Sequence, residues 1–426
     1  MNDARQLIGS VLTEKAAGKE KNRIFLVREN SGYREAFDIL YGEEGTKCVR
    51  AGSSCVCYHA VMPHEGNRSG LLKEFYPCYS DRENIFFLQR REDNSLCVSE
   101  GIRSAARKFL QARESFLESY RYLRETMEAV PEMKSFIPEF TIYRSCAPDG
   151  SVTENGTVYI WTNNEPMETF DRFLENVRAR PSAPPAKTLS VILHAILNLT
   201  ECIGMMHRAG LLHLDIKPSN FGFRMRGDKP LLDAICLFDI NSFVSSAGSR
   251  KQIPFAGTEG YSAGEISIKP NVKSDIYSIG ATLFEAVAVY RDPKSKGFRR
   301  EYYTKTPEFV RQSPLIAAMP HPGREQLEDI LTRILTGFLG DFDHRRPDAR
   351  ELTELLKKAV ACLPAPTLEE NRLPDPVWDE TDEDRRREER LTLLQHLFAH
   401  PLYACCRQLG LSQRAALMAP AFLLLS

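Results

Sequence analysis

The 426-residue chain has no long apolar run. No stretch reaches the roughly 18 uninterrupted apolar residues that a membrane-spanning helix needs, so we expect no transmembrane span. The first 22 residues also lack the apolar core of a secretory signal peptide. A cytoplasmic location is the expectation that follows.

The chain lacks an excess of charge of either sign, since its formal net charge is −1. No overall field therefore favours nucleic acid or an acidic membrane as a partner. Its 11 cysteines lack the spacing of a zinc site, because Cys55-x-Cys57 and Cys405-Cys406 are the only close pairs. An odd count without an export signal favours reduced thiols.

No internal repeat is evident, and the first part of the chain has the patterns of strands. Residues 1–45 are polar and are interpreted as an N-terminal extension, with a strand-like patch at 23–29. Alternating small and β-branched residues predict two or three antiparallel strands at 46–76, and strands are expected again between 139 and 164. Apolar residues at a spacing of three to four predict a long amphipathic helix at 101–130.

The following two hundred residues have the patterns of helices. A largely apolar helix is predicted at 188–210, where Gly210 supplies a C-terminal stop. A hairpin is expected over 221–240, and further helices are predicted at 274–290, 325–339 and 348–363. A strand-rich part followed by a helical part places a cleft between them.

The end of the chain changes in composition. Residues 363–390 are charged and carry four prolines, which is typical of a solvated linker. Residues 391–426 form an apolar segment too short to span a bilayer. We expect this segment to dock on the preceding domain or on a partner.

The stretch "HLDIKPSN" at 213–220 follows the long helix directly. Alone it fits a polar turn, in which Asp215 and Asn220 hydrogen-bond backbone groups, as well as it fits a catalytic loop. Its companions favour the loop: "LFDIN" at 237–241, "GTEGYSAGE" at 257–265, and then Asp275 and Arg346, stand in a consistent order behind it.

On these motifs the chain resembles the protein kinase family over roughly residues 46–362. "HLDIKPSN" meets the pattern His-Arg-Asp-x-Lys-x-x-Asn, except that Leu214 replaces the arginine. "LFDIN" is similar to Asp-Phe-Gly, and "GTEGYSAGE" to Gly-Thr-x-x-Tyr-x-Ala-Pro-Glu. The resemblance implies an α+β, bilobal fold with a small β-rich N-lobe carrying one main helix (46–165) and a larger α-helical C-lobe (166–362).

The resemblance also implies ATP and Mg²⁺ as cofactors and a protein substrate with a serine or threonine hydroxyl. Asp215 would accept the hydroxyl proton, and Lys217 would contact the transferred phosphate. Asn220 and Asp239 would hold the metal through oxygen atoms. Three further residues have implied supporting roles: Thr258 would bond Asp215 and Lys217, Asp275 would cap the loop amides, and Arg346 would pair with Glu265.

Upstream, "LLKEF" implies that Lys73 holds the α- and β-phosphates. Its glutamate partner would be Glu118 or Glu114 on the long helix, and we favour Glu118 because the apolar Tyr122 follows it by one turn. The remaining nucleotide contacts implied by alignment come from the phosphate loop and the hinge, namely Gly52, Ser53, Ser54, Val56, Asn163 and Asn164, with Thr162 at the back of the pocket.

Three loops depart from the family pattern. The phosphate loop keeps only Gly52 of three glycines, Leu214 removes the arginine that anchors a phosphorylated activation segment, and Asn241 replaces a glycine. The five chemical residues all remain: Lys73, Asp215, Lys217, Asn220 and Asp239. We therefore expect a serine/threonine protein kinase that does not require phosphorylation of residues 242–256. The alternatives are a pseudokinase scaffold and a kinase-fold phosphotransferase acting on a small molecule.

Overall fold

The structure is a computed structural model of the chain. It divides into two units, Met1–Pro364 and Ala365–Ser426, and every described residue belongs to the first. The predicted linker from residue 364 onward and the apolar segment 391–426 lie outside the described residues. These are 22–39, 50–51, 55–76, 79–81, 84–86, 88–90, 96–98, 103–146, 150–153, 156–163, 167–179, 184–226, 229–239, 244–245, 258–267, 269–288, 297–320, 323–340 and 346–363.

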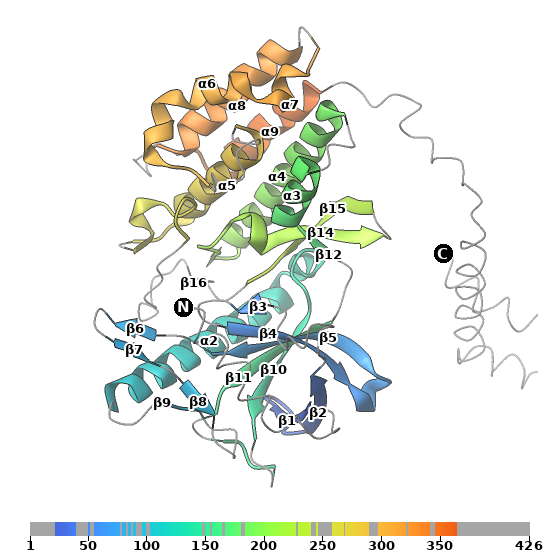
Figure 1. Cartoon of the computed structure of the whole chain (residues 1–426), viewed down its shortest axis with the longest axis vertical. Helices are drawn as coiled ribbons and strands as arrows, with labels where there is room; N and C mark the ends of the chain where they lie inside the picture. Colours follow the sequence, from blue (N-terminus) through green and yellow to red (C-terminus); the bar gives the residue numbers. More distant parts are fainter. Residues whose placement is uncertain are drawn as a thin grey trace, which may run out of the picture. The chain divides into compact units, whose positions relative to one another are not determined.

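Seven antiparallel strands form the main sheet, in the order β2-β1-β10-β11-β5-β4-β3 (Figure 1). Strand β2 also pairs with β4 through Asp38–Val61 and Ile39–Ala60, so six of the strands close into a ring. The strands are β1 (Asn22–Arg28), β2 (Arg34–Ile39), β3 (Arg50–Ala51), β4 (Cys55–Met62), β5 (Arg68–Phe75), β10 (Phe140–Ser145) and β11 (Val158–Asn163). Because β1 and β2 belong to this sheet, the predicted boundary at residue 46 does not mark its edge.

One face of the sheet is covered by α2 (Arg103–Ala129), which confirms the helix predicted at 101–130. Its apolar stripe recurs every three or four residues and is buried: Phe109, Phe116, Leu117, Tyr120 and Leu123. The ring of Phe75 on β5 lies 6.0 Å from that of Phe109 and 4.8 Å from that of Phe116, measured between centroids. Aromatic packing therefore fixes α2 on this face.

The opposite face of the sheet lines the inside of the ring of strands. Phe37 of β2 packs against Tyr143 of β10 and Trp161 of β11, with centroids 5.0 and 5.3 Å apart. Glu74 is also buried on this face, where its carboxylate accepts hydrogen bonds of 2.9 Å from the hydroxyls of Tyr58 and Tyr159. The hairpin β1–β2 thus gives this face a core of its own.

The second part of the first unit is mainly helical, as predicted. The long apolar helix is α4 (Pro185–Arg208), which packs against α5 (Val272–Val287) and α9 (Ala349–Ala361). By length and composition alone α4 could cross a membrane, with a mean hydropathy of 1.6, but 61% of that stretch is buried within the fold. It is the central helix of this core.

The remaining elements are short or flank this core. The predicted hairpin is β14 (Phe221–Arg226) and β15 (Lys229–Leu237), which β12 (Met167–Thr169) joins as a third strand. The other helices are α3 (Phe170–Ala179), α6 (Thr306–Gln312), α7 (Pro314–Ala317), α8 (Gly323–Phe338), and the 3₁₀ turns η2 (Pro63–Glu65), η3 (Pro131–Ser135), η4 (Pro218–Asn220), η6 (Gly264–Ser267) and η7 (Arg300–Lys305). The other strands are β6 (Tyr79–Asp81), β7 (Asn84–Phe86), β8 (Leu88–Arg90), β9 (Leu96–Val98), β13 (Leu211–Leu212) and β16 (Val244–Ser245).

Candidate functional site

The predicted catalytic loop connects β13 to η4, and the side chain of Asp275 on α5 hydrogen-bonds its backbone. The Asp275 carboxylate accepts hydrogen bonds from the backbone N–H of His213 at 2.9 Å and of Leu214 at 2.7 Å. This confirms the predicted cap. A third contact was not foreseen: His207 Nε2 lies 2.9 Å from the same carboxylate. Burial acts to raise the pKa of Asp275, but the hydrogen bond and charge of His207, with His213, lower it below its ordinary value.

Leu214, which stands in the place of the family's arginine, is buried and has a left-handed backbone with φ of 62°. A non-glycine residue in this conformation costs about 1–2 kcal/mol, which the surroundings must offset. The bond from its N–H to Asp275 and packing against Leu212 and Ile266 do so. The loop is therefore anchored by apolar contacts at the position where an arginine would bind a phosphate.

Asp215 lies at the centre of a hydrogen-bonded cluster. Its Oδ1 accepts a bond of 2.6 Å from the Thr258 hydroxyl, and its Oδ2 accepts bonds of 2.8 Å from Lys217 Nζ and from Asn220 Nδ2. Lys217 also donates to the Thr258 hydroxyl oxygen at 2.8 Å. The contacts predicted for Thr258 are confirmed. Three side chains from two separate segments thus fix the position of one carboxylate.

Asn220 and Asp239, the expected metal ligands, come from neighbouring segments. The backbone N–H of Phe238 donates to the Asn220 carbonyl at 2.7 Å, so the chain just before Asp239 lies against η4. The amide nitrogen of Asn220 donates to Asp215, so the amide oxygen of Asn220 can bind other partners. The Ser219 hydroxyl donates to this oxygen at 3.3 Å. An amide oxygen and a carboxylate are hard donors that suit Mg²⁺, so these residues fit that ion.

Lys73 of β5 pairs with Asp239, not with the glutamate favoured from the sequence. Its Nζ lies 2.6 Å from Asp239 Oδ1. Burial acts to lower the pKa of Lys73, but the charge of Asp239 holds it well above its ordinary value. Glu118 is on the exposed side of α2, and Glu114 pairs with Arg121 at 3.0 Å. The structure therefore places the carboxylate of Asp239, rather than that of Glu118, on this lysine.

A buried tyrosine of α2, Tyr120, lies near Lys73, and each influences the pKa of the other. Tyr120 is 2% exposed and belongs to the apolar stripe that faces the sheet, and its ring packs against Phe116 and Phe140. Burial raises the pKa of its hydroxyl, against the opposing influence of Lys73. The sequence interpretation missed Tyr120 because it searched the helix for a carboxylate; the stripe itself marks this position.

The register of β4 places the side chain of Val56, a predicted nucleotide contact, on the face opposite Lys73. Paired residues in an antiparallel sheet share a face, and Lys73 pairs with Cys57, whereas Val56 pairs with Glu74. The side chain of Val56 therefore points into the ring of strands, away from Lys73. Cys57, which the sequence interpretation missed, lies on the lysine side. Residues 52–54 of the phosphate loop lie outside the described residues.

The register of β11 also decides which face the side chain of Asn163 occupies. On β11 it pairs with Gly70, which shares the face of Glu74, whereas Thr162 pairs with Leu71 on the face of Lys73. The predicted position of Thr162 beside the pocket is thus consistent with the register. The side chain of Asn163 faces away from the nucleotide side, so only its backbone could contact a base there. Asn164, Ile240 and Asn241 lie outside the described residues.

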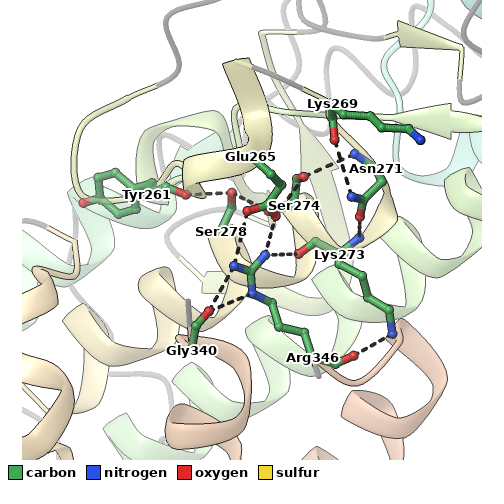
Figure 2. A network of polar contacts seen from close by, with 9 residues as sticks. All are labelled: Tyr261, Glu265, Lys269, Asn271, Lys273, Ser274, Ser278, Gly340 and Arg346. Atoms are coloured by element: carbon green, nitrogen blue, oxygen red, sulfur yellow. Dashed lines mark hydrogen bonds and ion pairs between the residues drawn. The ribbon is translucent and has the colours of Figure 1, made fainter. Parts of the chain in front are cut away.

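The predicted pair between Glu265 and Arg346 is confirmed and belongs to a larger network (Figure 2). Arg346 is 3% exposed and contacts both carboxylate oxygens of Glu265, at 3.3 Å for Nη2 and Oε2. It also donates to the carbonyls of Gly340 at 3.0 Å and Lys273 at 3.3 Å. Ser274 donates to Glu265 at 3.2 Å. The network connects η6, α5 and the segment before α9.

Comparison with known proteins agrees with these features. Residues 149–356 match the family model of the protein kinase domain. Protein kinase YpkA of Yersinia pseudotuberculosis is 28% identical over 171 residues, which cover 38% of this chain and 21% of that protein. Eukaryotic translation initiation factor 2-alpha kinase 3 of Bos taurus is 34% identical over 110 residues, covering 24% and 10%. Serine/threonine-protein kinase PknA of Nostoc is 31% identical over 96 residues, covering 22% and 17%. The match spans about a fifth or less of these relatives.

Solved structures extend the likeness to the fold of nearly the whole chain. The kinase domain of ROP18, solved in complex with AMP-PNP and sucrose, gives a TM-score of 0.54 at 14% identity and covers 84% of this chain and 89% of that one. A rhoptry antigen kinase domain of Toxoplasma gondii gives 0.50 at 11% identity, covering 84% and 91%. At such identities the likeness shows the bilobal α+β fold alone. Together with the family match over residues 149–356, it shows a kinase-like fold that contains a region similar to the protein kinase domain.

Proposed function

We propose that this chain transfers the γ-phosphoryl group of ATP, with Mg²⁺, to serine or threonine hydroxyls of proteins. One observation carries the proposal: the carboxylate of Asp215 is held by Lys217, Asn220 and Thr258 at 2.6–2.8 Å. A polar turn would need only backbone bonds, whereas here side chains from separate segments converge on one carboxylate. This argues against the interpretation of the loop as a simple polar turn.

The residues divide the chemistry of phosphoryl transfer, in which positioning and charge neutralisation dominate. Asp215 orients the acceptor hydroxyl and takes its proton, and Lys217 lies beside that carboxylate to neutralise charge on the transferred group. Lys73 supplies a fixed positive charge for the nucleotide phosphates. Asn220 and Asp239 would hold Mg²⁺, which would neutralise phosphate charge. All five groups described here are oxygen or ammonium groups suited to those roles.

The hydroxyl specificity rests on Lys217. In the family a lysine two residues after the catalytic aspartate accompanies serine and threonine preference, and one similar protein is the serine/threonine-protein kinase PknA of Nostoc. Lys217 contacts both Asp215 and Thr258, so it belongs to the cluster and is not a surface charge. We propose the same preference here.

We also propose that turnover does not depend on phosphorylation of residues 242–256. Leu214 offers no guanidinium for a phosphate, and its backbone is held instead by Asp275 and by apolar packing. Phosphatase treatment of the purified full chain should leave the rate of protein phosphorylation unchanged. A loss of activity that returns on rephosphorylation would refute this proposal.

The central test is the Asp215→Asn variant of the full chain, assayed with Mg²⁺ and γ-labelled ATP on a generic protein substrate. Loss of a positioned general base should lower the rate by about 10²–10⁴-fold. Asp329→Asn, an exposed aspartate on α8, is the matched control and should retain full activity. Equal signals from wild type and Asp215→Asn would favour the pseudokinase alternative. ATP turnover that labels no protein would indicate a small-molecule acceptor.

A further inference from the structure

Tyr120 of α2 lies over the part of the sheet that carries Lys73. Alternate residues of a strand share a face, and Phe75 of β5 packs against α2, so Leu71 and Lys73 point toward this helix as well. The ring of Phe116 contacts those of both Phe75 and Tyr120, with centroids 4.8 and 4.9 Å away. One shared aromatic neighbour therefore connects Tyr120 to the residue two positions after Lys73.

A second contact places Tyr120 from the other end of this row of side chains. Its ring lies 5.0 Å from that of Phe140 on β10, edge to face. Phe140 pairs with Thr162 of β11, and Thr162 pairs with Leu71 of β5. Because paired residues of an antiparallel sheet share a face, Phe140 stands across the sheet from the residue two positions before Lys73. The two contacts therefore bracket Lys73 along β5.

The hydroxyl is the polar part of this otherwise apolar contact. Tyr120 is 2% exposed, and a buried phenol needs a polar partner. Burial raises the pKa of the hydroxyl, so it keeps its proton at neutral pH, and Lys73 is the ionisable group with the largest influence on it. The oxygen of a neutral phenol can accept a hydrogen bond from an ammonium group.

The two glutamates considered for this role point elsewhere. Successive residues of a helix are turned by about 100°, so Glu118 lies about 200° around α2 from Tyr120, and it is exposed. Glu114 pairs with Arg121 of the same helix at 3.0 Å. The side chain that α2 directs toward the face of Lys73 is therefore a phenol.

We propose that Tyr120 is a positioning residue for Lys73, and that its Oη accepts a hydrogen bond from the ammonium group when Lys73 binds the nucleotide phosphates. This inference rests on the proposed function. In the structure Lys73 pairs with Asp239, which is also an expected metal ligand. Once Asp239 binds a metal ion, Lys73 loses that partner, and the Tyr120 hydroxyl keeps the ammonium group on the nucleotide side. A neutral hydroxyl also leaves the full charge of Lys73 to the phosphates.

The change Tyr120→Phe removes one oxygen and retains the ring packing. We would measure binding of ATP with Mg²⁺, and of adenosine, to the full-length protein by isothermal titration calorimetry. Only ATP has phosphates for Lys73, so Tyr120→Phe should weaken ATP about tenfold, as for loss of a hydrogen bond to a charged group, and change adenosine less than about twofold. The matched control is Tyr122→Phe, which removes the hydroxyl of a half-buried tyrosine on the same helix and should weaken neither ligand.

A double-mutant cycle with Lys73→Met separates positioning from packing. If Tyr120 acts through Lys73, Tyr120→Phe should weaken ATP in the wild-type background and cause no further loss in Lys73→Met. The inference is overturned if Tyr120→Phe binds ATP as tightly as the wild type, if it weakens ATP and adenosine equally, or if it weakens ATP equally in both backgrounds. Failure of the wild-type chain to bind ATP would refute the proposed function itself, and this inference with it.

Discussion

Replacing Arg346 with methionine should destabilise the fold more than removing any exposed ion pair. The guanidinium is 3% exposed, and besides Glu265 it bonds the carbonyls of Gly340 and Lys273 and lies 4.9 Å from the ring centroid of Tyr277. Methionine retains much of the volume but none of these donors. The variant would therefore leave the carboxylate of Glu265 without its buried counter-charge.

The magnitude follows from the burial of the pair. Removing one partner of a buried ion pair costs about 3–5 kcal/mol, whereas an exposed pair is worth about 0–1 kcal/mol. Because the Glu265 side chain is still 18% exposed, the lower part of the buried range applies, about 3 kcal/mol. Glu265→Gln in the Arg346→Met background removes the stranded charge. The double variant should therefore be more stable than the sum of the two single variants predicts, by about 1–3 kcal/mol.

Urea unfolding of the four full-length proteins, followed by far-ultraviolet circular dichroism, measures this cycle. The exposed pair of Lys357 with Glu201, whose side chains are 52% and 47% exposed, is the matched control, and Lys357→Met should cost less than about 1 kcal/mol. If Arg346→Met costs no more than Lys357→Met, or if the two single changes are additive, the network of Figure 2 does not stabilise the fold as argued.

Three further predictions concern the loop and the sheet. Burial holds the pKa of His213 below its ordinary 6.5, so the unfolded chain takes up this proton at a higher pH than the folded chain does. The free energy of unfolding should therefore keep its full value above about pH 6.5 and decrease below that pH. The decrease should be smaller in His213→Asn. Asp275→Asn should lower the midpoint of thermal unfolding, since a neutral amide cannot accept the loop amides with both oxygens. Gly70→Ala should cost about 1–3 kcal/mol by urea unfolding, because a Cβ would lie 2.4 Å from the Thr162 carbonyl, whereas Gly264→Ala meets nothing within 4 Å and should be nearly neutral.

The sequence predicted the helices and the catalytic loop well because their signals are long or chemically unambiguous. Helix α4 lies at Pro185–Arg208, against a prediction of 188–210, because an apolar pattern over so many residues has one period. The roles of Asp275, Thr258 and Arg346 were predicted from ordered motifs. Each is confirmed by contacts that cross from one segment to another.

The errors concern which face a residue occupies. In β4, the family spacing counted from Gly52 reaches Cys57, so the prediction of Val56 was one residue short, and a shift of one residue exchanges the two faces of a strand. The same parity turns the side chain of Asn163 away from the nucleotide side, while its place on the hinge stays a prediction. In α2, Glu118 follows the buried Leu117 directly, and one residue turns the helix by about 100°. Local sequence does not decide which face these residues occupy; the pairing of β4 with β5 and the packing of Phe116 against Phe75 do.

Lys73 and Asp239 form an ion pair within the proposed nucleotide site. Each group is expected to contact phosphate or metal, yet here they contact each other at 2.6 Å. The two side chains are 17% and 40% exposed, so the pair lies between an exposed and a buried one and should cost on the order of 1–3 kcal/mol to separate. Asp239 has φ of 53°, so its backbone is strained in the same state. In the proposed kinase, phosphates and a metal would compete for both groups, so the pair would have to separate when the nucleotide binds.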